Sequence, residues 1–322
     1  MILDRYRKNN IIKLLFGAFI SLILIYYSMN NFNYDKFNIK IEQANYTKIF
    51  FASILLIFTV YIRAFRWKKL FDIESISPNF LYKAEFIGYF GNNILPLRLG
   101  EILRTLVVGE KYKIKKTTVL GSIILERILD MFAVGMFVVV LFFLNYKLII
   151  QINYIFLFSL IGMLLIGIIG IIFSLFKKNN NINTKNKFLL IVHDISVGFS
   201  KLRNENIVII LFQSFFIWLI YLVQLYLVQD AFNLGLNINQ VIIMLLISTA
   251  SISIPALPGN FGTFEGSIVY SLSLFNISDN FGFGFLLHAI SFIPFTFLGL
   301  LYFVEQIDLI KNFKSNFSMN NE

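Results

Sequence analysis

The chain has 322 residues, of which 57% are hydrophobic and 14% are charged, and it carries a net charge of +10. An ordinary soluble domain has about 25% charged residues, and a soluble core of this size could not take up so much apolar surface without leaving large exposed patches. These numbers exclude an ordinary soluble enzyme, a disordered chain and a coiled coil. The absence of cysteine also removes disulfides, thiol catalysis and cysteine-ligated metals.

Apolar runs of about the length of a bilayer span recur along the whole chain. A helix needs about 20 mostly apolar residues to cross a hydrocarbon core of about 30 Å. Runs free of charged residues cover residues 14–34, 131–146, 148–176, 206–229, 231–264 and 280–304. A shorter run at 49–62 is bounded by Lys48, Arg63 and Arg66, whose long side chains can reach the headgroups. The sequence therefore predicts an all-α, polytopic membrane helix bundle, one domain over residues 1–322, whose first run is an uncleaved helix.

The positions of the basic residues predict the topology. If the N-terminus is cytoplasmic and the spans alternate, most of the 28 basic residues fall on the cytoplasmic side, which is the positive-inside signal of a membrane protein. The basic residues on the external side are then Lys36, Lys40, Lys48 and Lys147. The bias holds only if residues 82–105 and 248–271 each enter and leave on one side. We therefore expect two re-entrant hairpins, cytoplasmic N- and C-termini, and a place in the cell membrane.

An amphipathic segment divides the chain into two halves. Between residues 185 and 204, apolar side chains recur at spacings of three and four, with charged residues between them. These apolar residues are Phe188, Ile191, Ile195, Phe199 and Leu202. The pattern predicts a helix on the cytoplasmic membrane surface. It joins a first half of about residues 1–176 to a second half of about residues 205–310.

The two halves share a short motif. Leu-Pro-x-x-x-Gly occurs at residues 95–100 and again at 257–262, and an acid, Glu101 or Glu265, follows soon after each copy. Proline and glycine interrupt helices, and an interrupted backbone at membrane depth is tolerated only where it is buried in protein or lines a wet cavity. Under the topology above, the two copies enter from opposite sides, as in the inverted repeats that mark a transporter's substrate site. The alternative is a chance repeat at two ordinary kinks.

Seven charged residues lie in or near membrane segments, where each would cost about 2.5–3.5 kcal/mol unless it is paired or faces water. They are Arg98, Glu101, Arg104, Glu126, Arg127, Asp130 and Glu265. Arg127 precedes Asp130 by three residues, so the two can pair on one helical face. Glu101 and Arg104 have the same spacing. We expect a polar cluster where the hairpins meet the helix that carries Glu126.

Two interpretations of this cluster stay open. In the first it is a path for a lipid headgroup, whose phosphate binds to Arg98, Arg104 or Arg127. In the second it is a structural network of salt bridges. Asn93, beside the first motif, could bind substrate or cap the broken helix, and capping is the more common role. His288, in the last span, could relay protons, although a helix-packing histidine is the more common case.

Three ordered motifs resemble a known family. Residues 88–104 (GYFGNNILPLRLGEILR) look like the first signature of a flippase-like membrane family that includes the transmembrane region of bacterial lysylphosphatidylglycerol synthases. Residues 126–130 (ERILD) resemble its second signature, and residues 254–265 (IPALPGNFGTFE) its third. The resemblance covers nearly the whole chain. It implies a helix bundle with re-entrant segments, translocation of a lipid between leaflets, and a possible homodimer.

The expected function is that of a lipid flippase or transporter, which moves an anionic phospholipid or lipid-linked headgroup between leaflets. The chain ends at Glu322, soon after its last span, so we do not expect the aminoacyl-transferase domain of the fused synthases or their lipid synthesis. The alternatives are a membrane glycosyltransferase, or an accessory subunit of one, acting on lipid-linked sugars, and a structural membrane protein without substrate.

No catalytic motif, metal site or nucleic-acid module is recognised in the sequence. We therefore expect no enzymatic activity, no cofactor and no nucleic-acid partner, and a membrane lipid as the partner. The expected substrate-binding residues are Asn93, Arg98, Glu101, Arg104, Glu126, Arg127, Asp130, Pro258, Gly259, Gly262 and Glu265.

Overall fold

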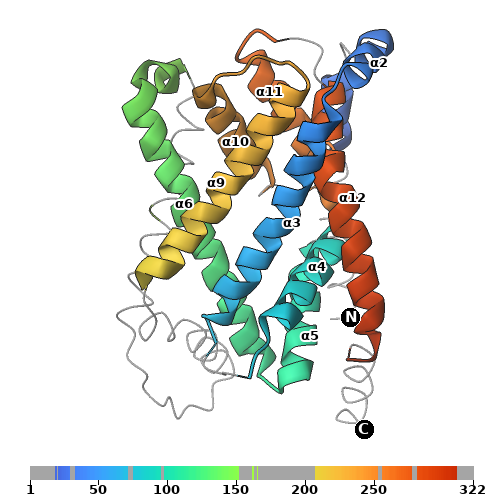
Figure 1. The fold of residues 1–322 in the computed structure, drawn as a ribbon, viewed down its shortest axis with the longest axis vertical. Helices are drawn as coiled ribbons and strands as arrows, with labels where there is room; N and C mark the ends of the chain where they lie inside the picture. Colours follow the sequence, from blue (N-terminus) through green and yellow to red (C-terminus); the bar gives the residue numbers. More distant parts are fainter. Residues whose placement is uncertain are drawn as a thin grey trace, which may run out of the picture. The chain divides into compact units, whose positions relative to one another are not determined.

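The fold is that of a computed structural model, which describes residues 19, 21–29, 33–71, 75–95, 98–151, 162, 165, 207–252, 256–277 and 281–309. Within these residues every regular element is a helix (Figure 1). The helices are α2 (Tyr34–Glu42), α3 (Tyr46–Lys68), α4 (Pro78–Ile94), α5 (Gly100–Tyr112), α6 (Lys116–Gln151), α9 (Ile207–Ala231), α10 (Ile238–Ile252), the short 3₁₀ helix η3 (Pro258–Asn260), α11 (Thr263–Ser273) and α12 (Phe281–Glu305). Residues 21–29 are also helical. The all-α prediction is confirmed for the described part of the chain.

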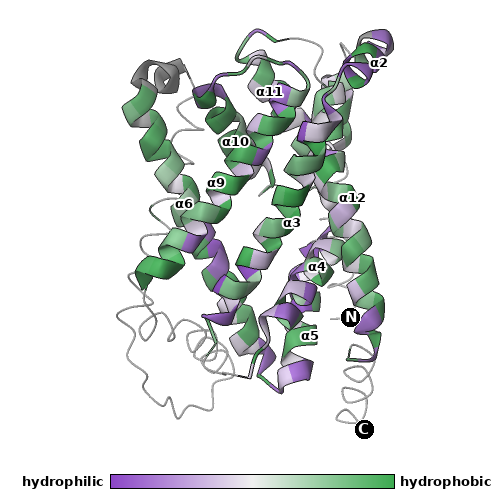
Figure 2. Ribbon diagram, in the orientation of Figure 1, coloured by the Kyte–Doolittle hydropathy of each residue, from purple (hydrophilic) through white to green (hydrophobic). Residues whose placement is uncertain are grey.

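Three helices, α3, α9 and α12, are long and apolar enough to cross a bilayer. They have 23, 25 and 25 residues, and a rise of about 1.5 Å per residue carries each across a core of about 30 Å. Hydrophobic residues dominate α9 in Figure 2, and large side chains such as Phe50, Phe212 and Ile293 are exposed. Such surface is stable against lipid rather than water. These helices confirm the membrane prediction for the runs 49–62, 206–229 and 280–304.

Some predictions fall outside the described residues. These are the amphipathic linker of residues 185–204, most of the run 148–176, and Pro96 of the first motif. Of the first apolar run, residues 19 and 21–29 are described, and they are helical.

The helices are interrupted where the two Leu-Pro-x-x-x-Gly motifs lie. The first interruption separates the end of α4 at Ile94 from the start of α5 at Gly100. The second separates Ile252 of α10 from Thr263 of α11 and contains η3. Pro258 opens η3, a position where its missing N–H leaves no helical hydrogen bond unmade. Both interruptions are confirmed, whereas the re-entrant path of each pair and the inverted repeat stay predictions.

The chain forms two compact units. Unit 1 consists of residues 1–57, 92–99 and 220–296, and unit 2 consists of residues 58–91, 100–219 and 297–322. Each unit combines segments that are distant in sequence, and α3, α9 and α12 contribute residues to both. The division into two sequential halves stays a prediction.

In unit 1, α10 and α11 pack against each other, and the helix of residues 21–29 lies against the segment that joins them. The Leu257 N–H donates a hydrogen bond to Ser21 Oγ at 2.9 Å. Gly262 has a φ of +84°, and a Cβ at this position would lie 2.4 Å from the Ser21 carbonyl oxygen. Glycine is therefore required at position 262 both by its dihedral angle and by the close backbone approach.

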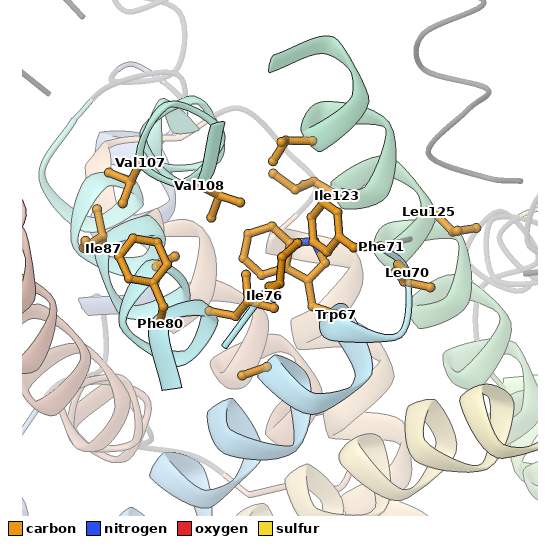
Figure 3. Close-up of a cluster of buried hydrophobic side chains, with 14 of the residues drawn as sticks. Trp67, Leu70, Phe71, Ile76, Phe80, Ile87, Val107, Val108, Ile123 and Leu125 are labelled. Atoms are coloured by element: carbon orange, nitrogen blue, oxygen red, sulfur yellow. The ribbon is translucent and has the colours of Figure 1, made fainter. Parts of the chain in front are cut away.

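In unit 2, the core surrounds the fully buried Trp67 (Figure 3). Its buried neighbours include Leu70, Phe71, Ile76, Phe80, Val108 and Ile123. Helices α4 and α5 approach so closely that a Cβ on Gly91 would lie 2.6 Å from the Cα of Gly100, and α5 packs in turn against α6. Each large apolar side chain stabilises such a core by about 1.5–3 kcal/mol. This packing holds α3, α4, α5 and α6 in place around a set of charged residues.

Candidate functional site: a buried charge network and a helix break

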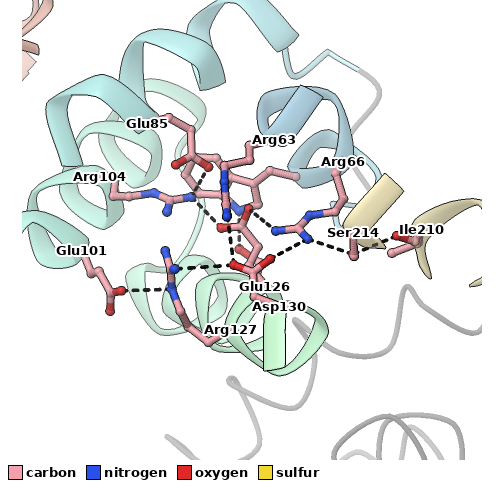
Figure 4. Close-up of polar contacts among 12 residues, drawn as sticks. Arg63, Arg66, Glu85, Glu101, Arg104, Glu126, Arg127, Asp130, Ile210 and Ser214 are labelled. Carbon is pink, nitrogen blue, oxygen red and sulfur yellow. Dashed lines mark hydrogen bonds and ion pairs between the residues drawn. The ribbon is translucent and has the colours of Figure 1, made fainter. Parts of the chain in front are cut away.

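Two arginines of α3 bind one aspartate of α6. Because Arg63 and Arg66 are three residues apart, they lie on one face of the helix. Their Nη1 atoms donate hydrogen bonds to the two carboxylate oxygens of Asp130, at 2.9 and 2.8 Å (Figure 4). Arg66 also donates to Ser214 Oγ on α9 at 2.8 Å, and Ser214 donates to the carbonyl of Ile210. The negative charge of Asp130 on α6 is thus compensated by two arginines of α3.

Arg104 of α5 connects α4 to α6. Its Nη2 donates hydrogen bonds to Glu85 Oε1 at 2.7 Å and to Glu126 Oε2 at 2.6 Å. Its guanidinium carbon lies 4.0 Å from the ring centre of Trp67, in cation–π range. A Cβ on Gly88 would lie 2.7 Å from Arg104 Cδ, so the glycine makes room for the arginine. With a side chain only 3% exposed, Arg104 is committed to contacts inside the protein.

The network reaches the surface of unit 2 at Arg127 and Glu101. Arg127 Nε lies 3.2 Å from Glu101 Oε1, and Arg127 Nη1 lies 3.5 Å from Asp130 Oδ2. The side chains of Arg127 and Glu101 are 41% and 35% exposed. The hydrogen bonds of the inner arginines to carboxylates are shorter, at 2.6–2.9 Å. Arg127 is therefore the most exposed and most loosely held arginine of the network.

The charges of the network balance. Its members are Arg63, Arg66, Arg104, Arg127, Glu85, Glu101, Glu126 and Asp130. With every group ionised, the formal charge is zero. Each buried ion costs several kcal/mol of lost hydration, which only good pairing offsets, and the loss of one partner from a buried pair costs about 3–5 kcal/mol. Since arginine keeps its proton in proteins, the positive half of this balance is fixed.

Part of the predicted polar cluster exists in unit 2, with some of its pairings changed: Glu101, Arg104, Glu126, Arg127 and Asp130 belong to one network, whereas Arg98 and Glu265 lie in unit 1. Arg127 pairs with Asp130, as their spacing predicts. Glu101 pairs with Arg127 rather than with Arg104, because Arg104 turns toward carboxylates on α4 and α6. Glu85 was missed, although an acid within the apolar sequence of α4 was a signal for it.

Arg63 and Arg66 require a correction. We expected them at the headgroups, but they are 4% and 0% exposed, because α3 directs both toward Asp130. The sequence signal was indirect, since the acids of α6 needed more positive partners than the single arginine beside them. Trp67, which stacks on Arg104, carried no signal of its role.

A buried acid outside the charge network lies in unit 1, at the break before α11. Glu265 Oε2 accepts the Gly262 N–H at 2.7 Å, and Glu265 Oε1 lies 2.7 Å from Nδ1 of His288 on α12. A carboxylate in the first turn of a helix is favoured by the unpaired N–H groups there. The rings of Phe261, Phe264 and Phe292 lie with their centres 4.9, 4.9 and 5.7 Å from that of the imidazole. The acid and the imidazole thus form a pair among aromatic rings.

Other expected site residues of unit 1 have partners of their own. Arg98 Nη2 donates to Asn260 Oδ1 at 3.1 Å, and both residues have positive φ angles, +56° and +61°. Asn93 donates to Thr296 Oγ1 at 2.8 Å, so its side chain bonds to α12. Gly259, in η3, also has a positive φ, +71°. The expected set is therefore divided, with these residues and Glu265 in unit 1 and the charge network in unit 2.

Comparisons with known proteins agree with a membrane protein of a defined family. A UPF0104 membrane protein of Methanocaldococcus jannaschii is 24% identical over 230 residues, which cover 70% of this chain and 98% of that protein. No solved structure matches the chain. The model of the family described as the lysylphosphatidylglycerol synthase TM region matches residues 11–299, which include the charge network and both helix interruptions. The chain belongs to this family of membrane proteins.

Proposed function

We propose that this protein moves an anionic phospholipid, or an anionic headgroup linked to a lipid, between the two leaflets of the cell membrane. The family description names a synthase of a lipid, lysylphosphatidylglycerol, which supports a role connected with membrane lipids. The membrane-length helices α3, α9 and α12 support a site of action within the bilayer. In this proposal the activity is transport rather than chemical conversion.

The observation that carries the proposal is the exposed edge of the charge network. A lipid headgroup that crosses a bilayer needs polar partners in place of water. The side chain of Arg127 is 41% exposed, although its Nε is buried, and its guanidinium is held only at 3.2 and 3.5 Å. A guanidinium can bind phosphate in a bidentate manner. Arg104, which we also expected at the phosphate, already donates to two carboxylates. We therefore assign the headgroup to Arg127, and to Arg104 the task of holding the network together.

The two helix interruptions add support. We propose that α4 with α5, and α10 with α11, are re-entrant hairpins that enter from opposite sides of the membrane, with both termini cytoplasmic. Paired interrupted helices in inverted halves are typical of transporters, whose substrates bind where the backbone is broken. The structure has an interruption in each predicted place.

Leaflet exchange in proteoliposomes tests the proposal. Vesicles carry fluorescent phosphatidylglycerol, and dithionite added outside destroys the label in the outer leaflet. We expect loss of the inner label only in vesicles that contain the protein. Arg127→Gln should slow this loss about tenfold, because a hydrogen bond to a charged group contributes about 1.5–3 kcal/mol and about 1.4 kcal/mol is a factor of ten.

The matched control is Lys113→Gln, which removes a positive charge from a side chain that is 80% exposed. This variant should exchange lipid at the wild-type rate. Folded wild-type protein that exchanges neither phosphatidylglycerol nor a polyprenyl phosphate would overturn the proposal. Wild-type exchange by a folded Arg127→Gln variant would remove Arg127 as the headgroup contact.

A further inference from the structure

Glu265 and His288 are the buried titratable pair that the charge network does not use. Glu265 is 2% and His288 7% exposed, and Glu265 has an oxygen bonded to Gly262 and an oxygen bonded to the imidazole. A buried carboxylate is costly unless a positive charge compensates it. His288 supplies that charge only when both of its ring nitrogens carry a proton. The net charge of the pair therefore depends on one exchangeable proton.

We propose that Glu265 and His288 form a proton-binding site, and that one proton moves through it with each anionic lipid. This inference rests on the proposed function. With Glu265 ionised, Nδ1 of His288 donates to it, and Nε2 is the atom that gains the proton. The pair then changes from one negative charge to zero, and the proton taken from water on one side is released to water on the other. Nothing is oxidised or reduced.

The described elements around this pair carry few other titratable side chains. Among the described residues of η3, α10, α11, the helix of residues 21–29 and the unit 1 part of α12, the other titratable side chains are Tyr26, Tyr27 and Tyr270, all exposed. The charged groups of α2 are Asp35, Lys36, Lys40 and Glu42, and α2 packs against α12 at Gly282, more than one turn from His288. Lys48 and Asp230 pair with each other.

Arg98 is the remaining charged group near the break. It donates to Asn260, and the carbonyl of Asn260 accepts a hydrogen bond from Thr263 Oγ1 in the first turn of α11. Glu265 lies in the same turn and holds Gly262, two residues after Asn260. A change of charge at the pair therefore acts on the segment to which Arg98 is bonded. This gives a physical link between the proton and the positive charge of Arg98.

One proton per lipid has a consequence that can be measured. A headgroup with one negative charge and a proton together carry no net charge, so the membrane potential does not act on their joint movement. A pH gradient does act on it. For each pH unit the lipid should accumulate about tenfold in the leaflet that faces the more alkaline solution, since one unit is a factor of ten in proton activity.

The experiment imposes a gradient of one pH unit on proteoliposomes and measures the leaflet distribution of labelled phosphatidylglycerol after exchange has reached a steady state. We expect wild-type protein to accumulate the lipid about tenfold on the alkaline side, with the same value when the membrane potential is clamped at zero. Exchange without accumulation overturns the inference and leaves the proposed function intact. No exchange of phosphatidylglycerol or of a labelled polyprenyl phosphate under any condition overturns the proposed function itself.

Two variants locate the effect at the pair. Glu265→Gln keeps an oxygen for the Gly262 N–H, and His288→Asn keeps a donor near the position of Nδ1, so both retain the local hydrogen bonds. Each should exchange lipid without accumulating it. His193→Gln is the matched control and should accumulate lipid as the wild type does. Accumulation by folded Glu265→Gln protein would overturn the assignment to this site.

Proton binding can also be measured without transport. The chain has two histidines, so His193→Gln leaves His288 as the single imidazole. In nitrogen-labelled protein in detergent, the ring signals report which nitrogens of His288 carry a proton. We expect the neutral and charged forms to interconvert as the pH is varied, and Glu265→Gln to change the balance between them. Signals that stay constant as the pH is varied would overturn the inference, whether or not lipid moves.

Discussion

The buried acids of unit 1 and unit 2 are neutralised in different ways. In unit 2, Asp130 and Glu126 face arginines, which stay charged at every pH that a folded protein tolerates. In unit 1, Glu265 faces His288, whose charge depends on its surroundings and on pH. In the first arrangement the positive charges are permanent, whereas in the second the positive charge comes from one proton on the imidazole. The type of partner, arginine or histidine, thus distinguishes a structural network from a pair that can gain or lose a proton.

The two regions also differ in how many partners each acid has. Asp130 accepts from Arg63 and Arg66 and lies near Arg127, so it connects α3 and α6. Among the residues that the structure describes, Glu265 has one side-chain partner and one backbone partner. A highly connected acid should matter for stability, and a sparsely connected one for function.

The largest expected effect is the loss of Asp130. Asp130→Asn removes the buried charge to which Arg63 and Arg66 both donate at 2.9 and 2.8 Å, and the free energy of unfolding should fall by about 3–5 kcal/mol. Chemical unfolding of the detergent-purified protein measures the change. The control is Asp230→Asn, which breaks a pair with Lys48 that is about 40% exposed and should cost about 0–1 kcal/mol. Equal effects of the two variants would contradict a scaffold role for the network.

The break in unit 1 should be almost as sensitive at Gly262. Gly262→Ala combines a strained dihedral angle with a Cβ that would lie 2.4 Å from a backbone oxygen, and should cost about 2–4 kcal/mol. Gly235→Ala separates the two causes, because Gly235 also has a positive φ but has nothing within 4 Å of its Cβ position. It should cost about 1–2 kcal/mol. If the two variants lose the same free energy of unfolding, the close approach to Ser21 does not contribute to the cost of Gly262→Ala.

A smaller effect on stability is expected at the exposed edge of the network. Arg127→Gln should lower the free energy of unfolding by about 1 kcal/mol, since the side chain is partly exposed and screened. Arg104→Gln should cost about 3–5 kcal/mol, because it removes the charge that bonds to the buried carboxylates of Glu85 and Glu126 at 2.7 and 2.6 Å. Unfolding curves of the two variants, measured side by side, check this difference. A loss at Arg127 as large as that at Arg104 would assign both to the scaffold.

The smallest expected effect lies outside the network, at Glu110 near the end of α5. A hydrogen bond from Lys116 lowers the pKa of Glu110 below its usual 4.5, with a further contribution from Lys113. A lowered pKa in the folded state stabilises the fold above the unfolded pKa, and this contribution is lost as the pH falls through the folded value. Glu110→Gln should therefore cost up to about 1 kcal/mol at neutral pH, and the difference should shrink below about pH 4.5. A difference that grows in acid would contradict the sign of this pKa shift.

The sequence predicted the features that local pattern determines. The three long apolar helices follow from composition, the interruptions follow from Pro258 and the Leu-Pro-x-x-x-Gly motifs, and the pairing of Arg127 with Asp130 follows from a spacing of three residues. Each of these signals lies within about one helix of sequence. Pairings between site residues that are close in the chain could therefore be predicted from the sequence.

Contacts between segments that are distant in the chain could not be predicted from the sequence. Arg63 and Asp130 are 67 residues apart, and nothing in either segment names the other. Arginines near the end of an apolar helix usually extend to headgroups, and only the packing of α3 on α6 shows that these two do not. The link between Glu265 and His288 spans 23 residues and two helices, so the sequence allowed a proton relay without supplying its partner.

The most direct test of the account is the exchange of labelled phosphatidylglycerol by wild-type and Arg127→Gln protein in vesicles of equal protein content. We predict that dithionite bleaches the inner-leaflet label through exchange in wild-type vesicles, and that the variant is about tenfold slower while remaining folded. Lipid transport by this protein would be contradicted by wild-type vesicles that bleach no further than protein-free vesicles, both with phosphatidylglycerol and with a labelled polyprenyl phosphate.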